Sequence, residues 1–241
     1  MKVTDYIADR INRLPLGYIF TYDDLVLEVE QIDSVTKALS RMVKAGKIRR
    51  LSPGRFYKPR ITEFGELKPE IYQVVKDLVE QDRKITGYLT GYSSFNSLGL
   101  TTQVPAQIQI GTNDVKKGLK RGTFKVSFIK QANRITKENI PLLRILDAMQ
   151  YIKEVPDSSV EQSCNILSYH INKLTVLEKE QIAGLAIKYR PATRSLTGAL
   201  IELSGPLEIA RILYKSLNPA STYVLNIPEA ILPNKEKWHI I

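Results

Sequence analysis

The residues with the clearest chemical potential are the basic side chains between positions 37 and 60. No Asp or Glu interrupts this run, whereas the first thirty residues mix both signs freely. Its members are Lys37, Arg41, Lys44, Lys47, Arg49, Arg50, Arg55, Lys58 and Arg60. A solvated protein face normally mixes charge signs. The run therefore favours contact with nucleic-acid phosphates over its alternatives, a solvated face or a protein-binding module.

The whole chain shares this excess of positive charge. Lys and Arg number 35 against 25 Asp and Glu in 241 residues, a net charge of +10. A second acid-free stretch extends from residue 116 to residue 137, and its first part forms a possible second basic surface: Lys116, Lys117, Lys120, Arg121 and Lys125. Three interpretations of this stretch stay open: it extends the DNA-binding surface, it binds an acidic partner, or it is an exposed solvated edge.

Few residues suit catalysis or metal binding. Cys164 is the single cysteine, and because it falls in an expected helix over 160–174 we interpret it as a core thiol. Together with His170 and His239 it leaves too few ligands for a structural zinc site. The letters Glu66-Leu67-Lys68 suit a nuclease, but they lie in an expected linker and not on a strand. We therefore expect no enzyme and no cofactor.

The elements that position the first basic run are helices and a hairpin. Apolar spacing predicts a helix over 3–14, and Thr21 is expected to cap a second, short helix ending near Glu28. Asp33 or Ser34 is expected to cap a third helix, which buries Val35, Leu39, Met42 and Val43. Residues 48–51 and 56–58 then pair across Ser52-Pro53-Gly54-Arg55, whose Pro and Gly suit a type II turn. This order predicts a winged helix-turn-helix domain over residues 1–60.

In that architecture the last helix enters the major groove while the hairpin, or wing, holds the backbone. We therefore assign groove contacts to Thr36, Lys37, Ser40 and Arg41. Contacts with phosphates or the minor groove are assigned to Lys44, Arg49, Arg50, Arg55 and Lys58. The expected partner is double-stranded DNA.

The rest of the chain predicts a linker over 61–69 and a mixed α/β, mostly helical C-terminal domain over 70–241, so that the fold class is α+β. Strands are expected over 107–110, 124–129 and 222–227. Helices are expected over 160–174, 177–189, 192–203 and 207–217, and Pro141 opens a strongly apolar helix. No run is apolar and long enough to span a bilayer, and no signal peptide is evident, so we expect a cytoplasmic protein without membrane contact.

Three segments carry a resemblance to a known family. They are Gly87-Tyr88-Leu89-Thr90-Gly91-Tyr92-Ser93-Ser94-Phe95-Asn96-Ser97-Leu98-Gly99-Leu100-Thr101-Thr102-Gln103-Val104-Pro105, Tyr189-Arg190-Pro191-Ala192-Thr193-Arg194-Ser195-Leu196-Thr197-Gly198-Ala199-Leu200, and the ending from Leu217-Asn218-Pro219 to Trp238. With the N-terminal elements, they resemble the antitoxins of abortive-infection E (AbiE-type) systems, in their shorter, single-winged-helix branch.

The resemblance implies a type IV antitoxin that counteracts a nucleotidyltransferase-like toxin and represses its own operon by binding inverted repeats. Two other functions stay open on the residues alone. One is a winged-helix transcription regulator with a ligand-sensing C-terminal domain, and the other is a nuclease.

Overall fold

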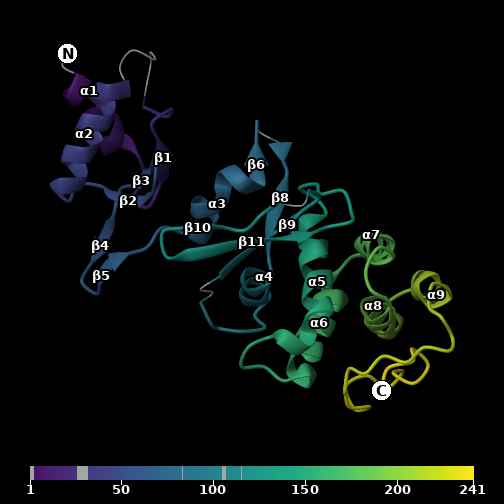
Figure 1. Cartoon of the computed structure of the whole chain (residues 1–241). Coiled ribbons are helices and arrows are strands. Elements are labelled where there is room, and N and C mark those ends of the chain that lie inside the picture. Colours follow the sequence, from purple (N-terminus) through teal and green to yellow (C-terminus); the bar gives the residue numbers. More distant parts are fainter. Residues whose placement is uncertain (1–2, 26–31, 83, 105–106, 115) are drawn as a thin grey trace. The chain divides into compact units, whose positions relative to one another are not determined.

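The protein is an α+β chain, seen in a computed structural model that describes residues 3–25, 32–82, 84–104, 107–114 and 116–241 (Figure 1). Its contacts divide it into two compact units. The N-terminal unit comprises Met1–Asp77 and Lys120–Phe124, and the C-terminal unit comprises Leu78–Leu119 and Lys125–Ile241. No helix of the described residues is long and apolar enough to cross a membrane.

In its described residues, the N-terminal unit contains two helices, a three-stranded sheet, a second hairpin and most of α3. Its elements are α1 (Val3–Arg13), β1 (Ile19–Thr21), α2 (Ile32–Lys44), β2 (Arg49–Ser52), β3 (Arg55–Tyr57), β4 (Arg60–Thr62), β5 (Gly65–Leu67) and α3 (Ile71–Val79). The sheet order is β1-β3-β2, with both pairs antiparallel. Ile7, Ile11, Leu39 and the stacked rings of Phe20 and Phe56 fill the core.

Several local predictions for this unit are confirmed. Helix α2 buries Val35, Leu39 and Met42, as its apolar spacing predicted. The β2–β3 hairpin is present, and Gly54 at its turn has φ +74°, which the third position of a type II turn requires.

Other local predictions for the N-terminal unit need correction. The amide and hydroxyl of Thr21 both donate to the Asp24 carboxylate, at 2.7 and 3.0 Å, and the amide contact is one half of a capping box. Residues 22–25 form a bend and turn, and the rest of the expected helix, 26–28, lies outside the described residues. Helix α2 begins at Ile32, which places the predicted cap Asp33 in its first turn. Residues 61–69, expected as a linker, contain most of the β4–β5 hairpin.

The C-terminal unit joins a small sheet to a set of helices. Its elements are β6 (Glu80–Gln81), β7 (Lys84–Ile85), β8 (Gly87–Thr90), α4 (Tyr92–Ser97), β9 (Gln107–Thr112), β10 (Leu119–Arg121), β11 (Phe124–Lys130), α5 (Ile140–Gln150), the 3-10 helix η2 (Ile152–Glu154), α6 (Val160–Lys173), α7 (Val176–Ala186), α8 (Pro191–Ser204) and α9 (Leu207–Lys215). The sheet order is β10-β11-β9-β8, and the turn end of the β10–β11 hairpin belongs to the N-terminal unit.

The helices predicted in the last third are confirmed, with α6 and α7 each opened by a capping box. The strand predicted over 222–227 is wrong. This segment makes a single bridge, from Tyr223 to Ile240, and buries Leu225 and Ile227 in the helical core.

The indole of Trp238 is fixed directly against helix α8. It packs on the backbone of Gly198, where an added Cβ would overlap its six-membered ring. Its indole nitrogen donates to Glu202 at 2.9 Å, and its backbone carbonyl accepts from the Ser195 hydroxyl. The resembling segments that contain Gly198 and Trp238 are therefore a packing motif in this fold.

We expect Gly198→Ala to lower the free energy of unfolding by roughly 1–3 kcal/mol, because a buried, hydrogen-bonded indole cannot move aside freely. Gly184→Ala in α7 is the matched control, since a Cβ there meets no atom within 4 Å. That substitution should stabilise the protein by roughly 0.5–1 kcal/mol through helix propensity. Urea unfolding followed by far-UV circular dichroism measures both, and equal effects of the two variants would contradict this account of the packing.

Candidate nucleic-acid interface

Helix α2 carries an exposed row of cations. Lys37, Arg41 and Lys44 are exposed and lie at helical positions i, i+4 and i+7, on the side away from the buried Val35 and Leu39. Within the part of the chain that the structure describes, these three cations have no hydrogen-bond or ion-pair partner. Thr36 and Ser40 are half-buried on the same helix. The structure thus brings together all five residues predicted on this helix.

The hairpin arginines are arranged differently from those of the helix. Arg50 is exposed, with its guanidinium 5.4 Å from the centre of the Phe56 ring. Arg49 instead donates to the Glu66 carboxylate at 2.9 Å and to the Gly46 carbonyl at 3.1 Å. The Tyr57 hydroxyl also donates to Glu66, at 3.0 Å. Arg49 therefore joins β2 to the β4–β5 hairpin.

Arg55 belongs to a second ion-pair cluster, centred on Asp77 of α3. The Asp77 carboxylate accepts from Arg55 and from Arg121, and Arg121 also donates to the Val74 carbonyl at 2.6 Å. Burial opposes ionisation of Asp77, but the hydrogen bonds and charges of Arg121 and Arg55 outweigh it and hold the pKa of this carboxyl below its usual value. Asp77 therefore stays ionised and keeps Arg55 engaged within the protein.

The structure gives three of these residues contacts or positions that the sequence did not predict. Lys58 donates to the Asn12 carbonyl at 2.9 Å, so it ties β3 to the end of α1. Arg121 is buried and paired with Asp77, so it is not part of an exposed second basic surface. Glu66 lies on strand β5, not in a linker, but Arg49 and Tyr57 occupy its carboxylate.

The remaining residues of the possible second basic surface are divided between the two units. Lys120 belongs to the N-terminal unit and is exposed. Lys117 and Lys125 of the C-terminal unit are also exposed, while the Lys116 ammonium lies 5.9 Å from the centre of the Phe128 ring. These four cations stay accessible, at least in part, to solvent.

Cys164 and His170, considered above for catalysis or metal binding, have neighbours that indicate a structural role. Cys164 is fully buried, and burial raises the pKa of its thiol to about 11, which keeps it protonated, as expected for a core thiol. A ring nitrogen of His170 lies 2.9 Å from the Leu98 carbonyl. Among the described residues, no three His, Cys, Asp or Glu side chains gather as metal ligands do.

A buried carboxylate in the C-terminal unit was not predicted. Asp147 of α5 accepts hydrogen bonds from the hydroxyls of Tyr88, Thr90 and Tyr189 at 2.6, 2.6 and 2.7 Å. Gln131 donates to both tyrosine oxygens, at 2.9 and 2.8 Å. The network joins β8, α5, the turn that follows α7 and the residue that follows β11. Its sequence signal was a lone acid inside the strongly apolar helix that Pro141 opens.

The fold and these surfaces define an α+β protein with a small basic unit followed by a larger, mostly helical unit. The sequence profile of a family of unknown function (DUF6088) matches residues 6–185, and the chain belongs to this family. No curated protein sequence matches it. The crystal structure of the RV2827C protein from Mycobacterium tuberculosis is similar, with a TM-score of 0.58 over 92% of this chain and 84% of that chain. At 13% sequence identity, this likeness concerns the fold alone.

Proposed function

We propose that the protein is a DNA-binding antitoxin that represses its own operon, and that its N-terminal unit is a winged helix-turn-helix domain. The observation that carries the DNA-binding part is the row of Lys37, Arg41 and Lys44 on α2, exposed and without internal partners among the described residues. The order of α1, β1, α2 and the β2–β3 hairpin supports the winged-helix assignment.

In this proposal the two basic elements have different roles. Helix α2 enters the major groove, where Thr36, Lys37, Ser40 and Arg41 reach base edges and neighbouring phosphates. Lys44 and the exposed Arg50 contact the backbone. The paired residues Arg49, Arg55 and Lys58 hold the hairpin in place and do not contact phosphates directly.

The antitoxin role is supported by the resemblance of three segments to AbiE-type antitoxins. The corresponding partner is a nucleotidyltransferase-like toxin encoded beside this gene, and the operator is an inverted repeat upstream of it. We expect expression of the neighbouring gene alone to arrest growth, and co-expression of this protein to restore it. Failure of rescue, with both proteins detected in the cells, would contradict the antitoxin role and leave the DNA-binding role intact.

DNA binding should depend steeply on salt. If Lys37, Arg41, Lys44 and Arg50 each neutralise one phosphate, counterion release predicts that log K falls with log salt with a slope of about −3.6 for one bound chain. Fluorescence anisotropy with a labelled duplex from the region upstream of the gene, between 50 and 200 mM salt, measures this slope. A duplex of unrelated sequence and equal length is the control. A slope near zero would contradict the assigned phosphate contacts.

A further inference from the structure

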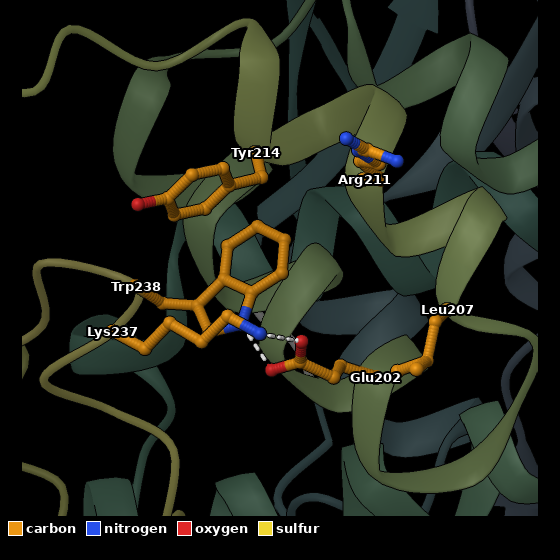
Figure 2. Close-up of a pocket in the computed structure, with 6 residues that line it drawn as sticks. All are labelled: Glu202, Leu207, Arg211, Tyr214, Lys237 and Trp238. Atoms are coloured by element: carbon orange, nitrogen blue, oxygen red, sulfur yellow. Dashed lines mark hydrogen bonds and ion pairs between the residues drawn. The ribbon is translucent and has the colours of Figure 1, made fainter.

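A hollow of about 350 Å³ opens between the end of helix α8, helix α9 and the C-terminal tail (Figure 2). Its walls are formed by Glu202, Leu207, Arg211, Tyr214, Lys237 and Trp238. This volume falls at the lower end of the range found for small-molecule sites in proteins.

The apolar side of the hollow is built from side chains in fixed positions. The Trp238 indole packs on Gly198 and donates to Glu202, and the Tyr214 ring meets its edge with centroids 5.5 Å apart. Figure 2 shows Tyr214 and Trp238 together on one side of the view, with Leu207 and Arg211 on the other. Leu207 is 62% exposed, so an apolar ligand there would cover surface that otherwise faces water.

The negative charge of this hollow is the Glu202 carboxylate, which already has an ion-pair partner and hydrogen-bond donors within the protein. The Glu202 carboxylate accepts from Lys237, from the Asn234 amide at 2.9 Å and from the Trp238 indole at 2.9 Å. Burial disfavours the ionised form of Glu202, but these three donors outweigh burial and hold its pKa below the usual value. Glu202 therefore neutralises Lys237 and is not available to a cationic ligand.

Arg211 is the remaining charge at the hollow. It is exposed on α9, one turn after Leu207, and none of the described residues forms a hydrogen bond or ion pair with its guanidinium. A planar guanidinium beside an apolar wall suits a carboxylate, which it can bind through two parallel hydrogen bonds. A ligand phosphate normally draws several cations, and here Lys237 is already paired.

We propose that this hollow binds a small carboxylic acid with an apolar body, the body lying against Leu207, Tyr214 and Trp238 and the carboxylate on Arg211. The proposal does not depend on the antitoxin role, since it rests on the C-terminal unit alone. It would give that unit the capacity to sense a ligand, as in the alternative function of a ligand-controlled regulator.

Octanoate is a suitable probe, and Trp238 is a built-in reporter because it is the single tryptophan of the chain. Titration of the full chain with octanoate should change the indole emission in a saturable way. Octanol and octylamine, which have the same chain length without the negative charge, should bind at least about tenfold more weakly, because they lose a charge-assisted hydrogen bond.

Arg211→Gln should weaken octanoate binding by about tenfold. Lys215→Ala, which removes an exposed cation one turn further along α9, should leave binding unchanged. Equal binding of octanol and octanoate to the wild-type chain would overturn the proposal, as would equal losses in the two variants. No emission change together with no binding in equilibrium dialysis would also overturn it.

Discussion

Replacing Lys37, Arg41 and Lys44 together with alanine is expected to lower the affinity for DNA on the order of 100-fold at about 0.15 M salt. At this salt concentration counterion release contributes roughly fivefold for each phosphate contact, and three contacts multiply. The free energy of unfolding should change little, because the three side chains are exposed and have no internal partner among the described residues. Fluorescence anisotropy with the duplex from the region upstream of the gene measures the affinity, and thermal unfolding measures stability.

A matched variant separates a specific surface from the general effect of net charge. Lys84, Lys153 and Lys215 are exposed cations of the C-terminal unit, and their joint replacement with alanine removes the same three charges. We expect this variant to bind DNA within about threefold of wild type, because none of the three lysines is assigned a phosphate contact and exposed charges without such a contact are largely screened at this ionic strength. Equal losses in the two triple variants would mean that α2 is not the DNA-binding surface.

The triple variant of α2 leaves Arg55 unchanged for a structural reason. Loss of Arg55 would leave the Asp77 carboxylate with Arg121 as its remaining cationic partner, so a change in DNA affinity could come from a displaced hairpin. The three cations of α2 have no such partner in the part of the chain that the structure describes, so their removal tests surface charge directly.

Local features of the basic unit could be predicted from the sequence because they depend on neighbouring residues. The buried face of α2 follows from helical spacing, and the hairpin turn follows from Pro53 and Gly54. The exposure of Lys37, Arg41 and Lys44 then follows from the same helix periodicity. These predictions needed no information about tertiary contacts.

The partners of the other cations could not be predicted, because they depend on long-range contacts. Arg49 meets Glu66 across seventeen positions, and Arg121 meets Asp77 across forty-four. A count of charges along the chain treats each of these arginines as a surface cation. Within the basic run of residues 37–60, the tertiary fold brings Glu66 to Arg49 and Asp77 to Arg55, which divides the run into accessible and structural members.

The wrong strand prediction over 222–227 has a similar cause. Leu225 and Ile227 are buried while Val224 is 53% exposed, so the alternation typical of a strand is real. However, the buried side chains pack against helices, and the segment forms a β-bridge from Tyr223 to Ile240 and hydrogen bonds to Ile241 in place of a paired strand. An alternating pattern of apolar residues predicts which side chains are buried. It does not predict whether the segment pairs with a neighbouring strand.

Asp147→Ala is expected to lower the free energy of unfolding by about 3 kcal/mol, because three hydroxyl donors lose their acceptor inside the C-terminal unit. Tyr88 and Tyr189 stay protonated, since burial and the nearby Asp147 charge raise the pKa of both phenols. Their hydroxyls and that of Thr90 would be left without the carboxylate at the centre of the network. Urea unfolding at pH 7 measures the loss, and a change below about 0.5 kcal/mol would show that the network contributes little.

Asp147→Asn separates the shape of this network from its charge. An amide oxygen at this position can accept from Tyr88 and Thr90, while its NH₂ group donates to Tyr189. We therefore expect a much smaller loss than for Asp147→Ala.

The pH dependence of the amide variant should also differ from that of wild type. Burial raises the pKa of Asp147 more than its three hydroxyl donors and Arg144 lower it. A carboxyl with a raised pKa in the folded state stabilises the fold below its unfolded pKa of about 4 and loses that contribution as the pH rises through the folded value. Wild type should therefore lose stability relative to Asp147→Asn as the pH rises above 4. A stability difference that stays constant with pH would mean that Asp147 is ionised in the folded protein as readily as in the unfolded chain.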